Sequence, residues 1–587
     1  RRHTRYPLVT GVQTCALPIL TEITISDVLE TVVQNQVSTL NGEKMKRVFF
    51  TSALLFTFIF QSTLFAQTTV KLTAEEKKIA ESISAAQISD YLHYIASDEM
   101  GGRDTPSNGL DLTAKFIATM LSRWGFKPAG DNGTFFQKIT LKSEALDASK
   151  TALSIGGTTF RLNEDYFRLS GNAAVSDVPV IFGGHGWMIK SKGIDALANI
   201  DVKGKIVIFN SGTSRSRNML VPPPDGITQA DLKGTRGVDW QDAVSNAVGK
   251  GAAGVVVIAS PEIQGMWDMV KQQFSRGSMY PEKLRPATAS NASTAPVVLA
   301  SKAVADSVFG GLPATGAAYD MKKSGSMSVV TKLEDKYTQN VVAIWEGGDP
   351  LLKKEMVAIG AHYDHVGTNP NAPGPDKIWN GADDDGSGTT AVLTIAEALA
   401  KAPKRPKRSV LFVWHCGEEK GLWGSEYFNK FPTVDIKNVI TQLNIDMIGR
   451  SRKPNDTNPK NKELSGENDI YVIGAEMMSS TLGSITKQTN AGYLNLGYDF
   501  RYDDPKDPNR FFFRSDHFNY AVNGIPIVFW FDGVHEDYHQ PGDHPDKIDY
   551  AKMEKVTRTI FLTLWELTDL KQRPVIDRQL PAELTQR

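Results

Sequence analysis

Apolar runs alternate with polar, helix-like stretches from about residue 338 onward. The runs that predict strands are "MVAIGAHY" (356–363), "SVLFVWHCG" (409–417), "VITQLNIDMI" (439–448), "IYVIGA" (470–475) and "IPIVFWFDG" (525–533). Between the first two lies "GTTAVLTIAEALAKA" (388–402), an amphipathic helix that ends at Pro403. Near-continuous apolar strands that alternate with helices predict an α/β fold with a mostly parallel central sheet, flanked by helices on both faces.

The chain before this region contains two different residue patterns. "TAEEKKIAESISA" (73–85) and residues 86–124 predict helices, because a Thr cap opens the first and apolar residues recur at helical spacing in the second. From about 150 to 330, short β-type runs with many Gly and Pro dominate: "VPVIFGG" (178–184), "GKIVIFNSG" (204–212), "AAGVVVIAS" (252–260) and "TAPVVLAS" (294–301), with one helical stretch at 238–251. This pattern predicts a β-rich module inserted into a larger domain.

The hydropathy pattern near the N-terminus indicates an export signal at residues 45–66. Lys46 and Arg47 precede an apolar stretch that ends at Ala66, before a polar "QTTVK". A membrane anchor is the alternative, but Gln61, Ser62 and Thr63 interrupt the apolar run before the ~20 residues that a span requires. A signal should begin its chain, so we expect Met45 to be the natural start. The stretch 1–44 contains "RRHTRYPLVTGVQTCALPI", which resembles a translated sequencing adapter, and is set aside from the fold.

Length and composition set the domain boundaries that we expect. A chain of 587 residues is too long for one ordinary core. We therefore expect an N-terminal helical part of the catalytic domain at 67–150, the inserted module at 151–330, the catalytic domain proper at 331–575 and a tail at 576–587. A formal net charge of -1 gives no indication of a nucleic-acid partner or an anionic membrane. Oligomeric state cannot be inferred from these features.

Polar residues stand where the predicted strands end. His362 and Asp364 end the first run, Glu418 and Glu419 the second, and Asp446 the third, while His539 follows the last run after a short loop. The run "NGADDDGSG" (380–388) precedes the helix at 388–402. Taken singly, each has an ordinary explanation, such as a helix cap for Asp384 or a solvated loop for the glutamates. Because ligands gather beyond the carboxyl ends of parallel strands, we instead expect these side chains to converge.

Imidazole and carboxylate ligands without thiolates suit zinc in a catalytic site, where one coordination position stays open. With a carboxylate shared between them, five such ligands can hold two ions about 3.5–4 Å apart, which is the spacing of two-metal hydrolases. Of two adjacent glutamates, one can bind metal while the other acts as a general base. The sequence therefore predicts a metal-dependent hydrolase.

These motifs together resemble a known family, the secreted co-catalytic dizinc aminopeptidases, which are related to glutamate carboxypeptidase and glutaminyl cyclase. The resemblance covers about residues 75–570. It depends on "GAHYDHVG", "NGADDDGSG", "HCGEEKGLWGSEYF", "NIDMIGR", "RSDHFNYAVNGIP" and "EDYHQPGDHPDKID", which occur in the family's order. It implies the zinc-exopeptidase fold, of phosphorylase/hydrolase-like type, and two Zn²⁺ ions per chain. The region 151–330 resembles the protease-associated domain that many such peptidases carry to shape access to the cleft.

The resemblance also assigns roles to residues. His362 and Asp446 would hold one zinc, Glu419 and His539 the other, and Asp384 would bridge both. Glu418 would be the general base, Asp364 would orient His362, and Tyr538 would stabilise the oxyanion. Relatives often have a cis peptide after the bridging residue, here before Asp385. Asp383 is then expected to be the least constrained of the three, either solvated or a neighbour of the ligands.

Several residues near these motifs are expected to play other parts. His365, His415, His517, His535 and His544 are expected beside the ligands or on the surface, and Cys416 is expected to be a small core residue. Asp516 could face substrate or support the ligands; the sequence leaves both open. The segment 451–513 is expected to line the pocket.

The implied function is an exported aminopeptidase that removes N-terminal residues from peptides or small aminoacyl substrates with a metal-bridging hydroxide and the Glu base. Three alternatives stay open: a carboxypeptidase, a glutaminyl cyclase, and a non-catalytic binding protein. A carboxypeptidase for acidic substrates would need clustered arginines, for which Arg450, Arg452, Arg501, Arg510 and Arg514 are available. A binding protein would lack some ligands, whereas here none is missing. We expect a periplasmic or extracellular protein without a stable membrane anchor.

Overall fold

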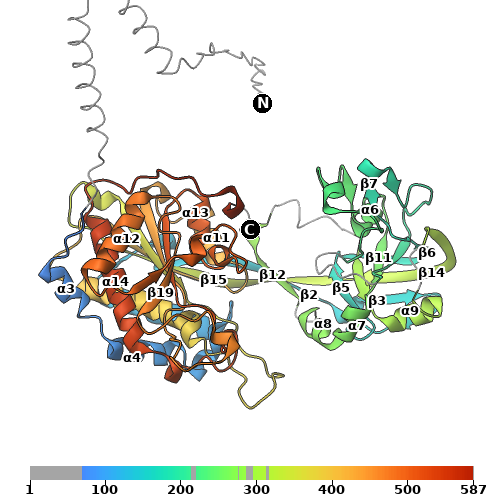
Figure 1. Cartoon of the computed structure of the whole chain (residues 1–587). Coiled ribbons are helices and arrows are strands. Elements are labelled where there is room, and N and C mark those ends of the chain that lie inside the picture. The colour runs from blue at the N-terminus through green and yellow to red at the C-terminus, as the bar shows by residue number, and fades with distance from the viewer. Residues whose placement is uncertain (1–68, 213–219, 275–276, 286–294, 313–315, 586–587) are drawn as a thin grey trace, which may run out of the picture. The chain divides into compact units, whose positions relative to one another are not determined.

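The computed structural model of the chain describes residues 69–212, 220–274, 277–285, 295–312 and 316–585 (Figure 1). The export signal predicted at 45–66 and the preceding residues 1–44 lie outside these ranges. Within them, none of the helices combines the length and the apolar character needed to cross a membrane.

Four parallel strands form the centre of a ten-stranded sheet. They are β17 (Ser409–His415), β16 (Met356–His362), β18 (Val439–Ile445) and β21 (Ile527–Phe531), adjacent in that order. Each lies inside an apolar run that predicted a strand. The α/β class and the parallel pairing are therefore confirmed for the part of the sheet that carries the polar strand ends.

The flanks of this sheet are antiparallel, in contrast to the mostly parallel sheet expected. On one side β15 (Thr331–Trp345) pairs with β17, β2 (Phe136–Leu146) with β15, and β12 (Ser278–Pro281) with β2; β1 (Lys127–Pro128) also pairs with β15. On the other side β19 (Asp469–Ile473) runs antiparallel to β21, and β20 (Gly497–Asp499) runs parallel to β19. The sheet as a whole is mixed.

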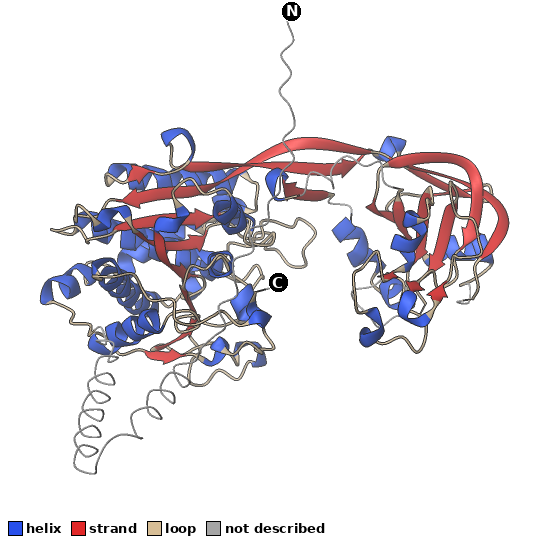
Figure 2. Ribbon diagram, turned by 90° about the horizontal axis from the view of Figure 1, so that it is seen from above, coloured by secondary structure: helices blue, strands red, loops and turns tan. Residues whose placement is uncertain are grey.

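Helices cover both faces of the sheet because the strands bury residues on both sides (Figures 1 and 2). In β16, Val357 and Ile359 belong to one core cluster, while Met356 and Ala358 belong to another. The first cluster includes residues of α3 (Ala74–Ala80), α4 (Ala85–Ile95), α5 (Asn108–Arg123), α10 (Gly388–Lys401), α12 (Ser480–Gly492) and α14 (Tyr550–Asp569). The second includes residues of α11 (Trp423–Lys430) and α13 (His517–Val522). The helices expected at 73–124 and 388–402 are thus present.

A second, eight-stranded sheet is built from residues between β2 and β15. Its strand order is β4 (Thr158–Phe160), β3 (Ala152–Ile155), β14 (Tyr319–Val329), β6 (Ala173–Phe182), β9 (Ile206–Asn210), β11 (Gly254–Ile258), β13 (Val297–Ala300) and β5 (Tyr166–Ser170). It has its own core on each face, with Val256 on one side and Val255 on the other. β2 ends at Leu146 before this region and β15 begins at Thr331 after it, and these two residues are paired.

Shorter elements complete this region. They are the three-stranded sheet of β10 (Trp240–Gln241), β7 (Met188–Ile189) and β8 (Ile194–Asp195), and the helices α6 (Ala243–Gly249), α7 (Pro261–Gly265), α8 (Trp267–Phe274) and α9 (Lys302–Phe309). β12 lies within the segment 151–330 by sequence, yet it pairs with β2 and so belongs to the first sheet.

Candidate metal centre and adjoining cavity

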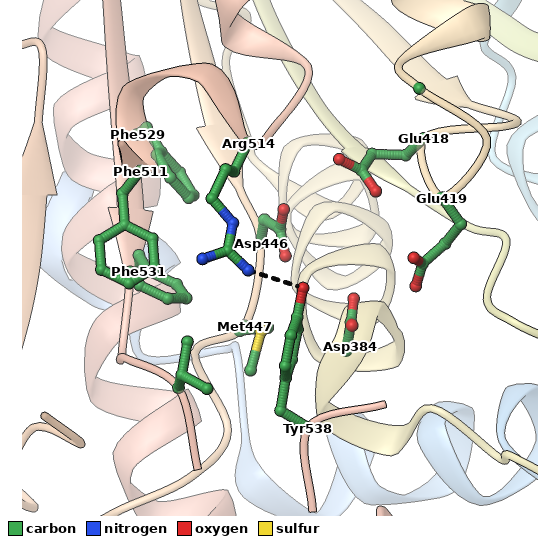
Figure 3. A pocket seen from close by; sticks show the side chains of 12 residues that line it. Asp384, Glu418, Glu419, Asp446, Met447, Phe511, Arg514, Phe529, Phe531 and Tyr538 are labelled. Atoms are coloured by element: carbon green, nitrogen blue, oxygen red, sulfur yellow. Dashed lines mark hydrogen bonds between the residues drawn. The ribbon is translucent and has the colours of Figure 1, made fainter. Parts of the chain in front are cut away.

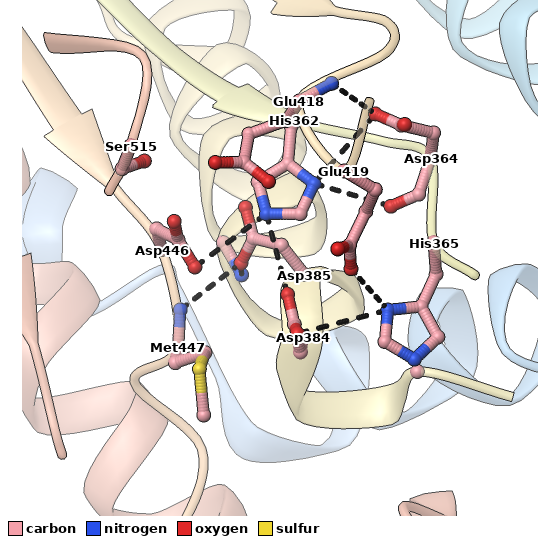
Figure 4. A network of polar contacts seen from close by, with 12 residues as sticks. His362, Asp364, His365, Asp384, Asp385, Glu418, Glu419, Asp446, Met447 and Ser515 are labelled. Carbon is pink, nitrogen blue, oxygen red and sulfur yellow. Dashed lines mark hydrogen bonds and ion pairs between the residues drawn. The ribbon is translucent and has the colours of Figure 1, made fainter. Parts of the chain in front are cut away.

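The polar residues that follow β16, β17, β18 and β21 meet at one edge of the sheet. His362 is the last residue of β16, Glu418 and Glu419 lie just beyond β17, and Asp446 follows β18 directly. The carboxyl ends of adjacent parallel strands lie at the same edge of the sheet. The side chains of the four segments that follow these strands therefore lie close together. Figure 4 shows His362, Asp384, Glu419 and Asp446 pointing toward one another.

Asp384 lies at the centre of two overlapping clusters. Its Oδ1 is 3.3 Å from His362 Nε2, which is in turn 3.5 Å from Asp446 Oδ1. Its Oδ2 is 3.1 Å from His539 Nε2, and this nitrogen is also 3.1 Å from Glu419 Oε2. The structure thus brings together all five residues that the sequence singled out as metal ligands, with Asp384 common to both groups.

His365 belongs to the second cluster, where the sequence did not predict a direct participant. It is fully buried, and its Nδ1 lies 2.9 Å from Glu419 Oε1 and 3.7 Å from Asp384 Oδ2. The available signal was its position three residues after His362, at the same strand end. His365, Asp384 and Glu419 have the spacing of a metal-ligand set, as do His362, Asp384 and Asp446.

The orientation of His362 leaves one nitrogen free for a ligand. Its Nδ1 lies 3.1 Å from the backbone carbonyl oxygen of Asp364. Because a carbonyl oxygen only accepts hydrogen bonds, the proton belongs on Nδ1, and Nε2 faces Asp384 and Asp446 with its lone pair. The Asp364 carboxylate is farther from Nδ1, at 3.7 Å, and accepts hydrogen bonds from the Glu418 amide and the Thr105 hydroxyl.

The arrangement fits a cation between the side chains better than direct pairing. Oδ2 of Asp384 and Oε1 of Glu419 are buried and accept no well-aligned hydrogen bond, although a histidine nitrogen lies near each. Oxygen and nitrogen atoms that lie close together without forming hydrogen bonds are suited to bind one ion between them. Oxygen and imidazole donors at this spacing match zinc.

The electrostatics also favour bound positive charge. Burial opposes ionisation of Asp384, yet His365, His362 and His539 hold the pKa of this carboxyl well below its usual value. Burial lowers the pKa of His539, but the nearby carboxylates of Asp384 and Glu419 outweigh it and raise the pKa of the imidazole to about 10. In the metal-free protein the His539 imidazole therefore carries an additional proton, and metal binding must displace it.

Glu418 has a different environment from its neighbour Glu419. Burial, together with the charges of Glu419 and Asp446, raises the pKa of Glu418 well above its usual value. The histidines at 365 and 539 instead outweigh burial at Glu419 and lower the pKa of this carboxyl to about 2. The environment of Glu418 thus suits a group that exchanges a proton, and the environment of Glu419 suits an ionised metal ligand.

A cavity of about 270 Å³ opens beside the acidic cluster (Figure 3). Asp384, Glu418, Glu419 and Asp446 line one part of it, and Met447, Phe511, Phe529, Phe531 and Val534 line an apolar part. Gly421, Arg514 and Tyr538 complete the lining, and Arg514 Nη2 donates a hydrogen bond to the Tyr538 hydroxyl at 3.0 Å. Within the segment 451–513, which was expected to line the pocket, only Phe511 does so.

All three aspartates of the run are buried, each with a different role. The bond between Asp384 and Asp385 is cis, as the family resemblance implied. Asp385 Oδ1 accepts hydrogen bonds from the amides of Gly388 and Met447, which joins the start of α10 to the end of β18. Asp383 Oδ1 accepts the Gly449 amide at 2.7 Å, and its Oδ2 lies 3.2 Å from His535 Nε2. The expectation that Asp383 is the least constrained is therefore wrong, because its buried carboxylate is held from two sides.

The remaining histidines and Cys416 lie outside the clusters, as expected. His415 faces Asp516 at 3.4 Å and the Tyr520 hydroxyl at 3.0 Å, so Asp516 is a buried supporting group rather than a residue of the cavity wall. His517 stacks on Phe529, and burial lowers its pKa to about 3. His544 is partly exposed and faces Asp376. Cys416 is buried in the core.

Comparison with known proteins identifies the sequence family of the segment that carries the clusters. Residues 340–564 match the profile of Peptidase family M28. Leucine aminopeptidase 2 of Arthroderma otae is 26% identical over 263 residues, which cover 41% of this chain and 46% of that protein. The chain thus spans about half the length of the curated relatives that it matches.

Two solved structures also align with the chain. The aminopeptidase from Aneurinibacillus sp. strain AM-1 has a TM-score of 0.48 and 18% identity, covering 86% of this chain and 98% of that one. A zinc aminopeptidase from Bacillus subtilis has a TM-score of 0.43 and 17% identity, covering 85% and 99%.

Proposed function

Residues 340–564 match the profile of Peptidase family M28, and on this premise we propose that the chain is an exported zinc-dependent aminopeptidase. The observation that carries the proposal is the pair of clusters that share Asp384, next to a cavity that Glu418 also lines. Leucine aminopeptidases among the matched relatives favour the same activity.

We propose a site for two zinc ions. His362 and Asp446 would hold one ion, Glu419 and His539 would hold the other, and Asp384 would serve both. His365 Nδ1, at 2.9 Å from Glu419 Oε1, orients the carboxylate of Glu419. When bound, the ions supply the Lewis acidity that polarises the scissile carbonyl group and activates the attacking water.

The chain's own residues manage the proton and the charge of the reaction. Glu418 takes a proton from the attacking water and delivers it to the leaving amine as the carbon–nitrogen bond breaks. Its raised pKa, caused by burial first and by Glu419 and Asp446 next, suits a group that must accept and release a proton. The Tyr538 hydroxyl donates a hydrogen bond to the oxyanion that forms at the carbonyl oxygen.

The cavity suggests the substrate class. A free N-terminal amine is cationic and would lie against the carboxylates, while Phe511, Phe529 and Phe531 offer an apolar wall to the first side chain. We therefore propose a preference for large apolar N-terminal residues.

The lining argues against the main alternative activity. Of the five arginines available for a carboxypeptidase of acidic substrates, only Arg514 lines the cavity, and Arg450 is paired with Asp537 at 2.9 Å. One arginine beside four carboxylates is a poor receptor for an acidic side chain.

A panel of aminoacyl chromogenic substrates, measured with and without a chelator, tests the proposal. We expect chelator-sensitive hydrolysis, fastest for leucine-like and phenylalanine-like substrates, and no hydrolysis when the amine is blocked. Equal rates on N-blocked peptides would favour a carboxypeptidase. Release of ammonia from a free N-terminal glutamine without cleavage of the peptide would favour a glutaminyl cyclase. No turnover with zinc bound would favour a binding protein.

Two further assignments are part of the proposal. We propose that residues 45–66 direct export to the periplasm or the cell exterior, and that 151–330 is a protease-associated domain that contributes no catalytic group. The eight-stranded sheet with its own core supports treating this segment as a separate module.

A further inference from the structure

We propose that Asp543 is a positioning residue that holds the backbone of the aspartate run, and thereby aims the carboxylate of Asp384. The proposal rests on the function above, because it concerns the residue that the two metal sites share. Asp543 lies outside the ligand set and does not line the cavity.

Three successive backbone amides of the run donate to this one residue. Asp543 Oδ2 accepts the Asp383 amide at 2.9 Å and the Asp384 amide at 3.1 Å. The backbone carbonyl of Asp543 accepts the Ala382 amide at 3.1 Å. Three amides directed at one residue leave the backbone of Ala382–Asp384 little freedom to rotate.

Asp543 is fully buried within reach of the charge of Asp383, an arrangement that costs free energy unless it is compensated. The two amides bound to Oδ2 supply one compensation. The guanidinium group of Arg450 supplies another, since its Nη1 lies 3.6 Å from Asp543 Oδ1. The carboxylate is therefore held through the two hydrogen bonds to Oδ2, while Oδ1 accepts no hydrogen bond and lies near the charge of Arg450.

The place of Asp543 in the chain couples the run to the second metal cluster. His539 lies four residues earlier, in the same loop after β21. The Trp379 indole, which precedes the run, donates a hydrogen bond to the His539 carbonyl at 3.0 Å. One loop thus contributes the ligand His539 and also, through Asp543, holds the backbone of the ligand Asp384. Loss of the Asp543 hydrogen bonds should therefore shift both ligands.

The test compares Asp543→Ala with Asp543→Asn and with a matched control. Asn keeps an oxygen that can accept both amides, whereas Ala removes it. Asp503→Ala is the control, because Asp503 is a partly buried carboxylate that also accepts a backbone amide, from Gly474 at 2.6 Å, away from the cavity. Two quantities are measured: zinc affinity by competition with a chromogenic chelator, and amide hydrogen exchange of 382–386 in the metal-free protein.

We expect Asp543→Ala to weaken zinc binding by about 10–100-fold, as loss of an outer-sphere partner does elsewhere, and to speed exchange at Asp383 and Asp384. Asp543→Asn should retain slow exchange and most of the affinity, and Asp503→Ala should bind zinc like the wild type. If Asp543→Ala is too unstable to purify, Asp543→Ser replaces it with the same expectation, since its hydroxyl is too short to reach both amides.

Wild-type zinc affinity and exchange in the Ala or Ser variant would overturn the proposal. An equal loss of affinity in Asp503→Ala would also overturn it, since the effect would then be one of general stability. If the wild-type chain bound no zinc, the proposed function would fail, while the exchange measurement would still decide whether Asp543 holds the run.

Discussion

Arg514 donates a hydrogen bond from Nη2 to the hydroxyl oxygen of Tyr538 across 3.0 Å at the wall of the cavity. The Tyr538 ring also stacks on His539, with ring centroids 4.0 Å apart. Burial, and then the charge of Asp384, raises the pKa of Tyr538 above its usual value, so the hydroxyl keeps its proton. Since Arg514 occupies the oxygen as a donor, the hydroxyl proton is available to a group in the cavity.

Replacement of Tyr538 by Phe should remove this donor and leave the stacked ring in place. We expect kcat to fall by about 10²–10³-fold with little change in KM, as for loss of other oxyanion donors. Steady-state kinetics on a leucyl chromogenic substrate measure both. Tyr471→Phe serves as the control, because its hydroxyl donates to the Glu463 carbonyl away from the cavity. A parallel loss in the control, or unchanged kcat in Tyr538→Phe, would refute the oxyanion role.

Glu418→Gln should separate proton transfer from metal binding. The amide has the same shape but cannot take a proton from water, so kcat should fall by at least about 10²–10⁴-fold. Zinc content, measured by atomic absorption, should equal that of the wild type because Glu418 is not among the proposed ligands. Turnover close to the wild-type rate would show that another group is the base.

Metal content distinguishes the two histidines of the second cluster. We expect close to two zinc ions per wild-type chain, one in His539→Ala, and two in His365→Ala with weaker binding of one of them. The reason is that His539 Nε2 lies between Asp384 and Glu419, at 3.1 Å from an oxygen of each. The Nδ1 atom of His365 is close to Glu419, at 2.9 Å, but is 3.7 Å from Asp384. The reverse result, with an ion lost only in His365→Ala, would exchange the roles of the two residues.

Removal of the metal should loosen the loop that contains the aspartate run. Three adjacent carboxylates repel one another once the compensating dications are gone. Hydrogen exchange of 380–388 should therefore be faster in chelator-treated protein than in zinc-loaded protein. The strands of the eight-stranded sheet provide an internal reference whose exchange should not change. Equal exchange of 380–388 in both states would contradict the prediction.

Glu566, which lies outside the candidate metal centre, should make the free energy of unfolding depend on pH. Burial, with repulsion from Glu76 and Asp569, raises the pKa of Glu566 from 4.5 to about 7. A carboxyl whose folded pKa is raised stabilises the fold only while it is protonated in the native state. Its contribution is complete below pH ~4.5 and is lost as the pH rises through ~7.

Glu566→Gln, which stays neutral, should therefore have wild-type stability at pH 4.5. At pH 8 it should be more stable than the wild type by about 1 kcal/mol, a figure reduced for the partial exposure of the side chain. Urea unfolding of both proteins at the two pH values measures the difference. A stability difference that does not change with pH would exclude this explanation.

The local sequence was sufficient to locate the central strands and the residues at their ends. Apolar runs of strand length predicted β16, β17, β18 and β21, and a helical period predicted α10. Once those strands were taken as parallel, His362, Glu419 and Asp446 had to lie at one edge, because parallel strands have their carboxyl ends on the same side. Information of this kind is carried by neighbouring residues along the chain, so the sequence alone was enough.

Other features depended on contacts between distant segments. The antiparallel flanks of the sheet follow from which strands pair, and an apolar run has the same pattern in either direction. The buried positions of Asp383 and His365, the contact of Arg514 with Tyr538, and the clamp of Asp543 on the aspartate run each join residues from different loops. No local period or motif specifies such partners, because a polar side chain in a loop can be solvated or buried with equal ease until the rest of the fold surrounds it. The sequence by itself thus determined the kinds of ligands and the sheet edge where they gather, and only the tertiary structure decided how each ligand is oriented.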